Sequence, residues 1–202
     1  WVNESSANRL EEARKRYETV ENEQKRQDLL LWIGYWQSLA ENMPELRVRL
    51  PDITFENRLT IRGSSRTVEL ISFEGAHTGS DAILYLSEQG IVFAADLLFV
   101  NCHPFLVEGD VNKLLAVLQE LANMKAETFV PGHGPLGTRQ DIALNIQYIS
   151  TCMQLASQLA NGEDIALEQI AQASIPAEFS SWELSNFFAT NLKVLAQHYA
   201  KR

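Results

Sequence analysis

Three short stretches of the sequence each carry one side chain that could bind a metal ion. They are residues 69–81 with His77, residues 90–96 with Asp96, and residues 127–134 with His133. Each stretch passes from apolar residues into a turn of small residues, which is typical of a strand that ends at the edge of a sheet. Two imidazoles and one carboxylate brought together at such an edge suit a divalent ion such as zinc.

Each of these residues also has a simpler interpretation when it is taken alone. His77 beside a glycine is weak evidence for a metal site, and Asp96 could serve as an ordinary turn or cap residue. His133 is stronger, because Gly132 and Gly134 on either side leave its imidazole on a bare turn. Core packing does not readily explain three such residues at the ends of three apolar strands.

Four further residues are candidates for a role at or near this site. His103 follows Asp96 in an apolar loop and either lines a substrate cavity or is a structural histidine. Cys102 is either a soft metal ligand or a small buried hydrophobic residue, and the second interpretation is preferred. Asp81 is expected to anchor its turn through backbone hydrogen bonds. His198 is interpreted as a surface residue of a C-terminal helix.

The residues that must position the three candidates form strands in the middle of the chain. From residue 45 onward apolar and polar residues alternate, which predicts a strand meander as far as Asp96. Residues 82–86 and 91–94 are predicted to form a hairpin around Gly90. Asp110 is a good N-cap for an amphipathic helix, and a buried strand over 128–130 follows it, so this passage predicts a crossover against the sheet.

Helices are predicted on both sides of these strands. Residues 4–43 are predicted to be helical, with an apolar stripe that includes Trp32 and Trp36, and the chain from Thr138 to the end is helical again. We therefore expect a domain over residues 1–135 and a helical C-terminal extension over residues 136–202. The first of these divides into a helical part, 1–44, and a part with strands and the crossover helix, 45–135.

Composition limits the possible partners of the chain. Its 202 residues carry a formal net charge of −9 with 46% hydrophobic residues. An acidic chain disfavours a nucleic-acid partner. No apolar run approaches the roughly 18–20 residues that span a bilayer, so no membrane partner is expected. Two cysteines are too few for a disulfide framework, which favours a reducing, cytoplasmic setting.

The three candidate stretches resemble the later motifs of the metallo-β-lactamase superfamily. Residues 75–81 are similar to its third motif, residues 93–99 to its fourth and residues 131–134 to its fifth. The order and the spacing also fit, with nineteen residues from His77 to Asp96 and thirty-seven from Asp96 to His133. The similarity covers roughly residues 45–135.

This resemblance implies a fold, an activity and a set of metal ligands. The fold is α/β, an αβ/βα sandwich, and the activity is metal-dependent hydrolysis of a small-molecule ester, thioester or amide. Two ions, which we expect to be zinc, occupy the complete site. His77 is implied as a ligand of one ion, His133 as a ligand of the other, and Asp96 as the carboxylate that bridges them.

The sequence departs from the family in one respect that matters for the metal site. The family's His-x-His-x-Asp-His motif is absent, since no two of the four histidines lie closer than 26 residues apart. Because the chain also begins at Trp1, we expect it to be the C-terminal half of such a domain, with partial or no metal occupancy and little activity alone. Its expected partner is the missing N-terminal half or a second copy of the chain.

Two other functions remain open at this point. The first is a non-catalytic interaction or dimerisation module, in which the motifs are inherited turns and the helices form an interface. The second is the redox branch of the superfamily, which uses two irons and more carboxylate ligands. The three stretches by themselves do not distinguish between these functions.

Overall fold

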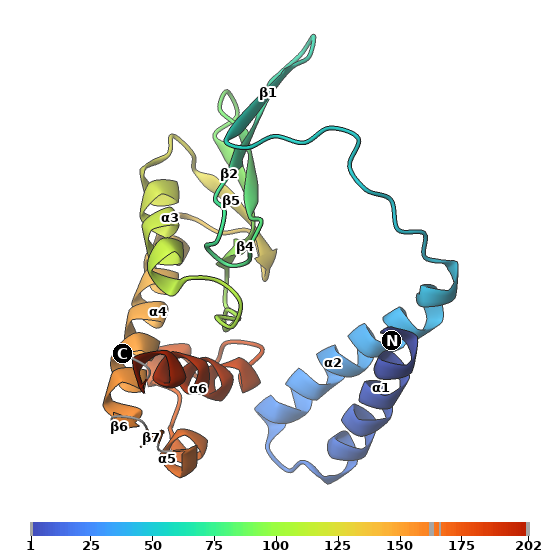
Figure 1. Ribbon diagram of the computed structural model, residues 1–202, viewed down its shortest axis with the longest axis vertical. Coiled ribbons are helices and arrows are strands. Elements are labelled where there is room, and N and C mark those ends of the chain that lie inside the picture. The colour runs from blue at the N-terminus through green and yellow to red at the C-terminus, as the bar shows by residue number, and fades with distance from the viewer. Residues whose placement is uncertain (1, 162–163, 166, 201–202) are drawn as a thin grey trace. The chain divides into compact units, whose positions relative to one another are not determined.

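The chain forms two compact units in the computed structural model, Trp1–Thr54 and Phe55–Arg202 (Figure 1). The structure describes residues 2–161, 164, 165 and 167–200. The sequence placed a boundary after residue 135, whereas the helices beyond that residue belong to the same unit as the sheet. A domain boundary at residue 135 stays a prediction.

The first unit is a helical hairpin of α1 (Val2–Thr19) and α2 (Glu23–Asn42), followed by the 3₁₀ turn η1 (Met43–Glu45). The sequence predicted helix throughout this region, and the structure interrupts it between the two helices. Asn22 is the reason, because its side chain accepts the backbone N–H of Lys25 at 2.9 Å and starts a new helix.

Aromatic side chains of α2 contact one another, and one of them contacts α1. Trp32 and Trp36 stack with their ring centroids 6.0 Å apart, and Tyr35 contacts Trp36 edge-on at 4.8 Å. From α1, the guanidinium of Arg9 lies 4.8 Å from the centroid of the Trp36 ring, which is a cation–π contact. These contacts agree with the helix-packing interpretation of the two tryptophans.

The second unit is built on a five-stranded sheet. Its strands are β1 (Arg58–Arg62), β2 (Thr67–Ser72), β3 (Ala82–Leu86), β4 (Ile91–Phe99) and β5 (Thr128–His133). They lie in sequence order, antiparallel except for the parallel pair β4 and β5. The helix α3 (Val111–Asn123) makes the crossover between that pair, and Asp110 caps it, as the sequence predicted. The predicted hairpin is also confirmed, with Gly90 at φ +65° in its turn.

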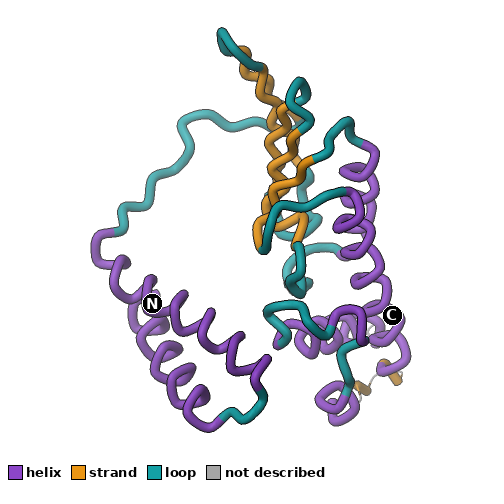
Figure 2. Tube along the Cα trace, turned by 180° about the vertical axis from the view of Figure 1, so that it is seen from behind, coloured by secondary structure: helices purple, strands orange, loops and turns teal. Residues whose placement is uncertain are grey.

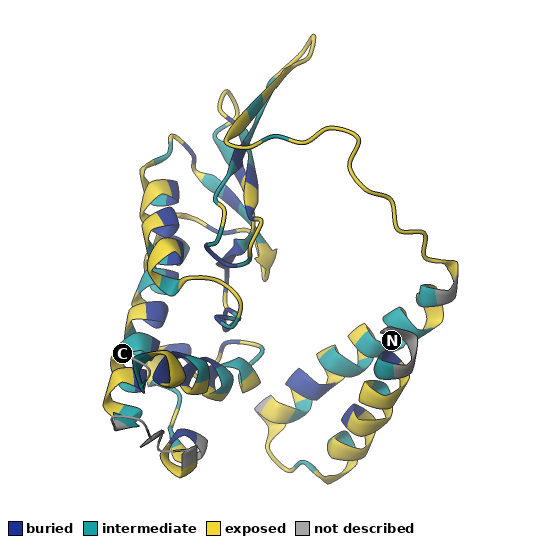
Figure 3. Cartoon of the chain, viewed as in Figure 1, coloured by how far each residue is buried: buried dark blue, intermediate teal, exposed yellow. Residues whose placement is uncertain are grey.

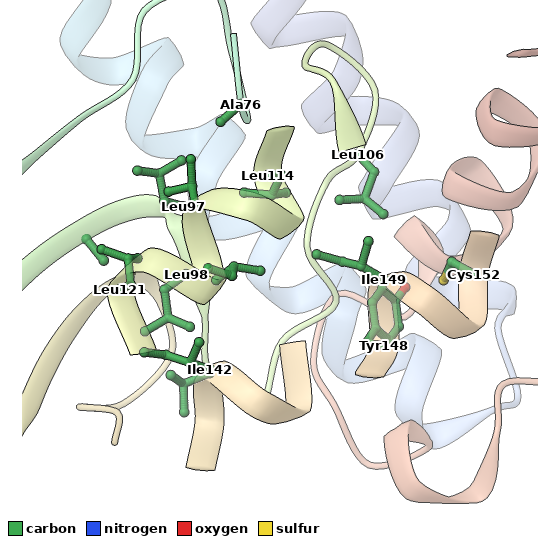
Figure 4. Close-up of a cluster of buried hydrophobic side chains, with 14 of the residues drawn as sticks. Ala76, Leu97, Leu98, Leu106, Leu114, Leu121, Ile142, Tyr148, Ile149 and Cys152 are labelled. Atoms are coloured by element: carbon green, nitrogen blue, oxygen red, sulfur yellow. The ribbon is translucent and has the colours of Figure 1, made fainter. Parts of the chain in front are cut away.

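Helices cover one face of this sheet. Two of them, α3 and α4 (Arg139–Leu159), lie along the same side of the strands in both views (Figures 1 and 2). Their buried sides face the strands (Figure 3). Figure 4 shows Leu97 and Leu98 of β4 among side chains that both helices contribute. The core residues from these two helices are Leu114, Val117, Leu118, Leu121, Ile142, Tyr148, Ile149, Cys152 and Ala156.

The other face of the sheet carries a row of apolar side chains that crosses all five strands. The strand pairing joins them in direct register, one from each strand: Leu59, Leu70, Leu84, Phe93 and Val130. Among the described residues none of the five belongs to the core cluster, and Phe93 is 42% exposed. We call these five residues the apolar row.

The C-terminal helices complete the second unit. After α4 come two short paired strands, β6 (Ala160–Asn161) and β7 (Asp164–Ile165), then α5 (Leu167–Gln172), the 3₁₀ turn η2 (Ala177–Phe179) and α6 (Asn186–Ala200). The long helices α4 and α6 pack against each other through buried residues that include Tyr148 and Leu192. None of the described helices combines the length and the apolar character that crossing a membrane requires.

Candidate metal centre

The structure brings the three predicted ligands together around the carboxylate of Asp96. Nε2 of His77 lies 3.8 Å from Oδ2 of Asp96, and Nε2 of His133 lies 3.5 Å from Oδ1. Each imidazole therefore faces a different oxygen of one carboxylate. Both distances are longer than a hydrogen bond. A tetrahedral zinc ion bound to one nitrogen and one oxygen would separate those atoms by about 3.3 Å, so each pair is close to that spacing.

An irregular backbone within β4 presents Asp96. Ala95 has φ 47°, in the left-handed region that residues other than glycine seldom adopt. The register between β4 and β5 shifts on both sides of Ala95. This break in the regular alternation of the strand is where the only carboxylate of β4 lies.

The neighbouring strand β5 must approach this carboxylate closely. A β-carbon on Gly132 would overlap Oδ1 of Asp96 and would stand 2.9 Å from the backbone nitrogen of Asp96. A glycine is therefore needed here for close approach. The sequence indicated that the glycines expose His133, and it did not reveal this packing against Asp96.

The loop that carries His77 is fixed by Asp81. The Asp81 carboxylate accepts the backbone N–H groups of Ala76, His77 and Thr78 at 3.0, 2.8 and 2.9 Å. It also accepts the Thr78 hydroxyl at 2.8 Å. The predicted anchoring role of Asp81 is confirmed, and four donors converge on one nearly buried carboxylate.

His133 ends β5 and is held by the chain that follows Asp96. Its carbonyl oxygen accepts the backbone N–H of Val100 at 3.0 Å. Gly134 follows with φ +93°, and a β-carbon there would overlap the carbonyl oxygen of Val100. The ring of Phe99 stacks on the His133 imidazole at 4.8 Å between centroids and lies 5.8 Å from the His77 ring.

The two imidazoles differ in their access to solvent. The His77 side chain is 8% exposed, whereas the side chains of His133 and Asp96 are each 48% exposed. Nδ1 of His77 is buried and has no hydrogen-bond partner in the described part of the chain. In metal sites the second nitrogen of a ligating histidine usually donates to an oxygen, which orients the ring.

These residues fit part of a two-ion site. Within the described ranges no three His, Cys, Asp or Glu side chains are grouped so that they could hold one ion. The arrangement is instead two pairs, His77 with Asp96 and His133 with Asp96, that share a carboxylate. The donors, imidazole nitrogen and carboxylate oxygen, are those that zinc accepts.

His103 lies in a different place, inside the hydrophobic core. It has no solvent exposure, and its Nδ1 is 2.9 Å from the Tyr148 hydroxyl. The rings of Trp182 and Phe188 contact it edge-on. This burial agrees with the structural alternative that the sequence left open, and a substrate-binding role for His103 stays a prediction.

The cysteines and the remaining histidine also lie away from the candidate centre. Cys102 and Cys152 are buried, and neither is joined in a disulfide. Burial raises the pKa of Cys152 to about 12. His198 is exposed on α6, as the sequence predicted.

The sequence missed two residues that shape the centre. Phe99 reads as one more apolar residue of a buried strand, although its ring lies against both imidazoles. Asn145 reads as a polar residue on a helix, although it is buried and bonds the backbone of Phe99. No local pattern marks either role, because both depend on which segments meet in the fold.

The fold and the motifs agree with comparisons to known proteins. A model of the metallo-beta-lactamase superfamily matches residues 6–133 of the chain. No curated protein sequence matches significantly. The match reaches further toward the N-terminus than the motifs do, since it includes most of α1 and all of α2.

Several solved structures share the fold at low sequence identity. The chain is similar to a metallo-beta-lactamase family protein from Thermus thermophilus, with 15% identity, a TM-score of 0.56, and 74% of this chain and 49% of that one covered. It is also similar to a beta-lactamase domain protein from Burkholderia ambifaria, with 15% identity, a TM-score of 0.54 and coverage of 80% and 48%. A third similar structure is a stereoselective inverting sec-alkylsulfatase from Pseudomonas sp. It has 17% identity and a TM-score of 0.56, with 74% of this chain and 27% of that one covered.

The chain spans about half the length of the first two of these proteins and about a quarter of the third. At these identities the similarity shows the fold alone. The family match over more than half of the sequence goes further. The chain belongs to the metallo-beta-lactamase superfamily.

Proposed function

We propose that this chain supplies His77, Asp96 and His133 to the two-zinc site of a hydrolase that acts on an ester, thioester or amide. Membership of the superfamily suggests a metal-dependent hydrolase. The observation that carries the finer proposal is the placement of the two imidazoles, each opposite its own oxygen of Asp96 at 3.8 and 3.5 Å.

In this proposal His77 and Oδ2 of Asp96 bind one ion, and His133 and Oδ1 bind the other. If bound there, the metal ions would supply Lewis-acid chemistry for hydrolysis. The chain's own residues keep the ligands in place. Asp81 fixes the His77 loop, and Gly132 lets β5 approach the carboxylate.

The remaining ligands must come from outside the 202 residues. Two protein ligands for each ion are fewer than the three that catalytic zinc sites normally use. The sequence contains no His-x-His-x-Asp-His motif. We propose that another polypeptide, either a further part of the same protein or a second chain, supplies them and packs on the apolar row. The row brings together one apolar side chain from each of the five strands, on the same sheet that carries Asp96 and His133.

A metal titration of the 202-residue chain tests the proposed site. Zinc content should be clearly substoichiometric after purification, and hydrolase activity should be absent or very low. Titrated zinc should bind weakly, and each of His77→Ala, Asp96→Ala and His133→Ala should lower the affinity by about tenfold or more. His198→Ala removes an exposed imidazole from α6 and should change nothing, which makes it the matched control.

Two results would contradict the proposal in different ways. Unchanged zinc affinity in all three ligand variants would show that the site does not bind metal. Two zinc ions for each chain, together with hydrolase activity, would show that no further ligands are needed. Iron in place of zinc in the isolated protein would favour the redox branch.

A non-catalytic interaction or dimerisation module is the second candidate, and the apolar row is the observation that favours it. Under this alternative the chain would self-associate through the row whether or not metal is present. Analytical ultracentrifugation of the chain and of Phe93→Glu would test this. A dimer that Phe93→Glu dissociates, with no zinc binding by the unmodified chain, would support the alternative over the hydrolase.

The compartment and the partner class stay predictions. Neither cysteine is joined in a disulfide, which supports a reducing, cytoplasmic setting. The net charge of −9 supports a small-molecule substrate over a nucleic acid.

A further inference from the structure

Asn145 is a buried amide on α4 that bonds both backbone groups of one residue on β4. The residue is 2% exposed. Its Oδ1 accepts the backbone N–H of Phe99 at 3.4 Å, and its Nδ2 donates to the carbonyl oxygen of Phe99. Nδ2 also donates to the carbonyl oxygen of Asp141, one turn earlier on α4, at 3.0 Å. Oδ1 of Asn145 thus has one hydrogen-bond partner, and Nδ2 has two.

The amide acts at a point where regular strand pairing has ended. On one side of this segment, β5 pairs Phe99 with His133 after two shifts of register. On the other side, the carboxamide of Asn145 presents a donor and an acceptor to Phe99, as a neighbouring strand would. The end of β4 is therefore held from two sides, once by β5 and once by α4.

The ring of Phe99 connects the Asn145 hydrogen bonds to the candidate centre. Its ring stacks on the His133 imidazole at an interplanar angle of 17° and lies tilted against the His77 ring at 58°. The chain has few ways to move Phe99 without moving at least one imidazole, because protein interiors are close-packed. A backbone hydrogen bond to Phe99 consequently fixes a surface that both rings touch.

We propose that Asn145 is a positioning residue, which sets the orientation of the His77 and His133 imidazoles through the backbone and ring of Phe99. This inference rests on the proposed metal site, because the orientation matters only if the rings bind metal. It differs from a purely structural role, in which Asn145 stabilises the core and has no effect on the ligands.

The chain contains a matched control for this comparison. Asn191 on α6 is also fully buried and also bonds the backbone on two sides. Its Oδ1 accepts the N–H of Leu106 at 2.9 Å, and its Nδ2 donates to the carbonyl oxygen of Pro104 at 2.7 Å and to the Tyr148 hydroxyl at 3.3 Å. It therefore holds the loop after β4 and not Phe99.

The experiment compares Asn145→Ala with Asn191→Ala in the full chain. Zinc affinity is measured by competition with a chromophoric chelator, and the imidazole signals are recorded by ¹H–¹⁵N NMR without metal. Both variants should be less stable to urea. Asn145→Ala should lower zinc affinity about tenfold or more, as loss of outer ligand support does in other sites. It should also shift or broaden the His77 and His133 signals. Asn191→Ala should keep the zinc affinity within about twofold of that of the unmodified chain. It should leave the His77 and His133 signals unchanged.

A third variant covers the case in which Asn145→Ala does not fold. Phe99→Leu leaves the backbone groups that Asn145 bonds and removes only the ring. It should reproduce the loss of affinity and the change in the imidazole signals.

Equal effects of Asn145→Ala and Asn191→Ala on affinity would overturn the inference. Unchanged imidazole signals in both Asn145→Ala and Phe99→Leu would overturn it as well. If the unmodified chain binds no zinc, the proposed function fails. The NMR comparison then still decides whether Asn145 orients the two rings.

Discussion

Gly132 and Asp96 lie so close together that a β-carbon on Gly132 would overlap the carboxylate of Asp96. We expect Gly132→Ala to force β5 away from β4 and to separate His133 from Oδ1. The cost in stability should be about 1–3 kcal/mol, typical of overpacking, and zinc affinity should fall with it. Urea unfolding and zinc titration measure the two effects. Gly79→Ala is the control, since a β-carbon at Gly79 meets nothing within 4 Å. Equal losses of stability and of zinc affinity in the two variants would contradict the overlap with Asp96 as the cause.

The Asp81 carboxylate is expected to be the main support of the His77 loop. Asp81→Ala removes the acceptor of three backbone N–H groups and one hydroxyl. Several buried donors would lose their partner, at a cost of about 2–4 kcal/mol. Asp81→Asn keeps one oxygen and should lose less than the alanine variant. Urea unfolding of the two variants tests this order, and a neutral alanine variant would contradict it.

The left-handed backbone at Ala95 gives a prediction with opposite signs for two substitutions. Glycine adopts a φ of 47° without strain, so Ala95→Gly should be neutral or stabilising by up to about 1 kcal/mol. A β-branched residue tolerates this region poorly, so Ala95→Val should destabilise by about 1–3 kcal/mol. Ala95 is exposed, so valine meets no lack of space. Thermal unfolding of both variants measures the difference, and equal stabilities would rule out backbone strain.

The buried thiol of Cys152 predicts a loss of stability in alkaline solution. Burial disfavours the thiolate and raises its pKa from 9.0 to about 12, so the folded chain holds this proton more tightly than the unfolded chain. The contribution is fully present below about pH 9 and is lost as the pH rises from there toward 12. Burial also raises the pKa of Tyr148 above its usual 10.0, which adds a loss in the same direction at higher pH.

Urea unfolding at several pH values isolates the part due to Cys152. Between about pH 9 and pH 10 the free energy of unfolding should fall more steeply for the unmodified chain than for Cys152→Ala. The slope is compared and not the absolute value, because the alanine variant also leaves a cavity. Identical slopes would show that Cys152 does not titrate as proposed.

Local pattern was enough to predict most elements of the second unit. The hairpin around Gly90, the cap at Asp110 and the crossover to β5 each depend on residues that are neighbours in sequence. The break between α1 and α2 was also available locally, since Asn22 is a good N-cap within a polar run. It was missed because the charged residues on both sides favour helix.

For the candidate centre, local pattern identified the three residues that lie together and not the contacts that support them. His77, Asp96 and His133 carry small-residue motifs that can be recognised in sequence. The contacts that support them join distant segments: Asn145 and Phe99 are 46 residues apart. The clash that requires Gly132 depends on a parallel pairing with shifted register, which no spacing in the sequence specifies.

The apolar row lies on the strands that carry Asp96 and His133 and on the strand that precedes the His77 loop. Leu70 lies on the strand that leads to His77, Phe93 precedes Asp96 on β4, and Val130 precedes His133 on β5. A polypeptide that packs across the row would therefore contact all three strands at once. It would restrain the movement of each strand relative to the next. Through these strands, docking on the row would also restrain the positions of Asp96, of His133 and of the loop that carries His77.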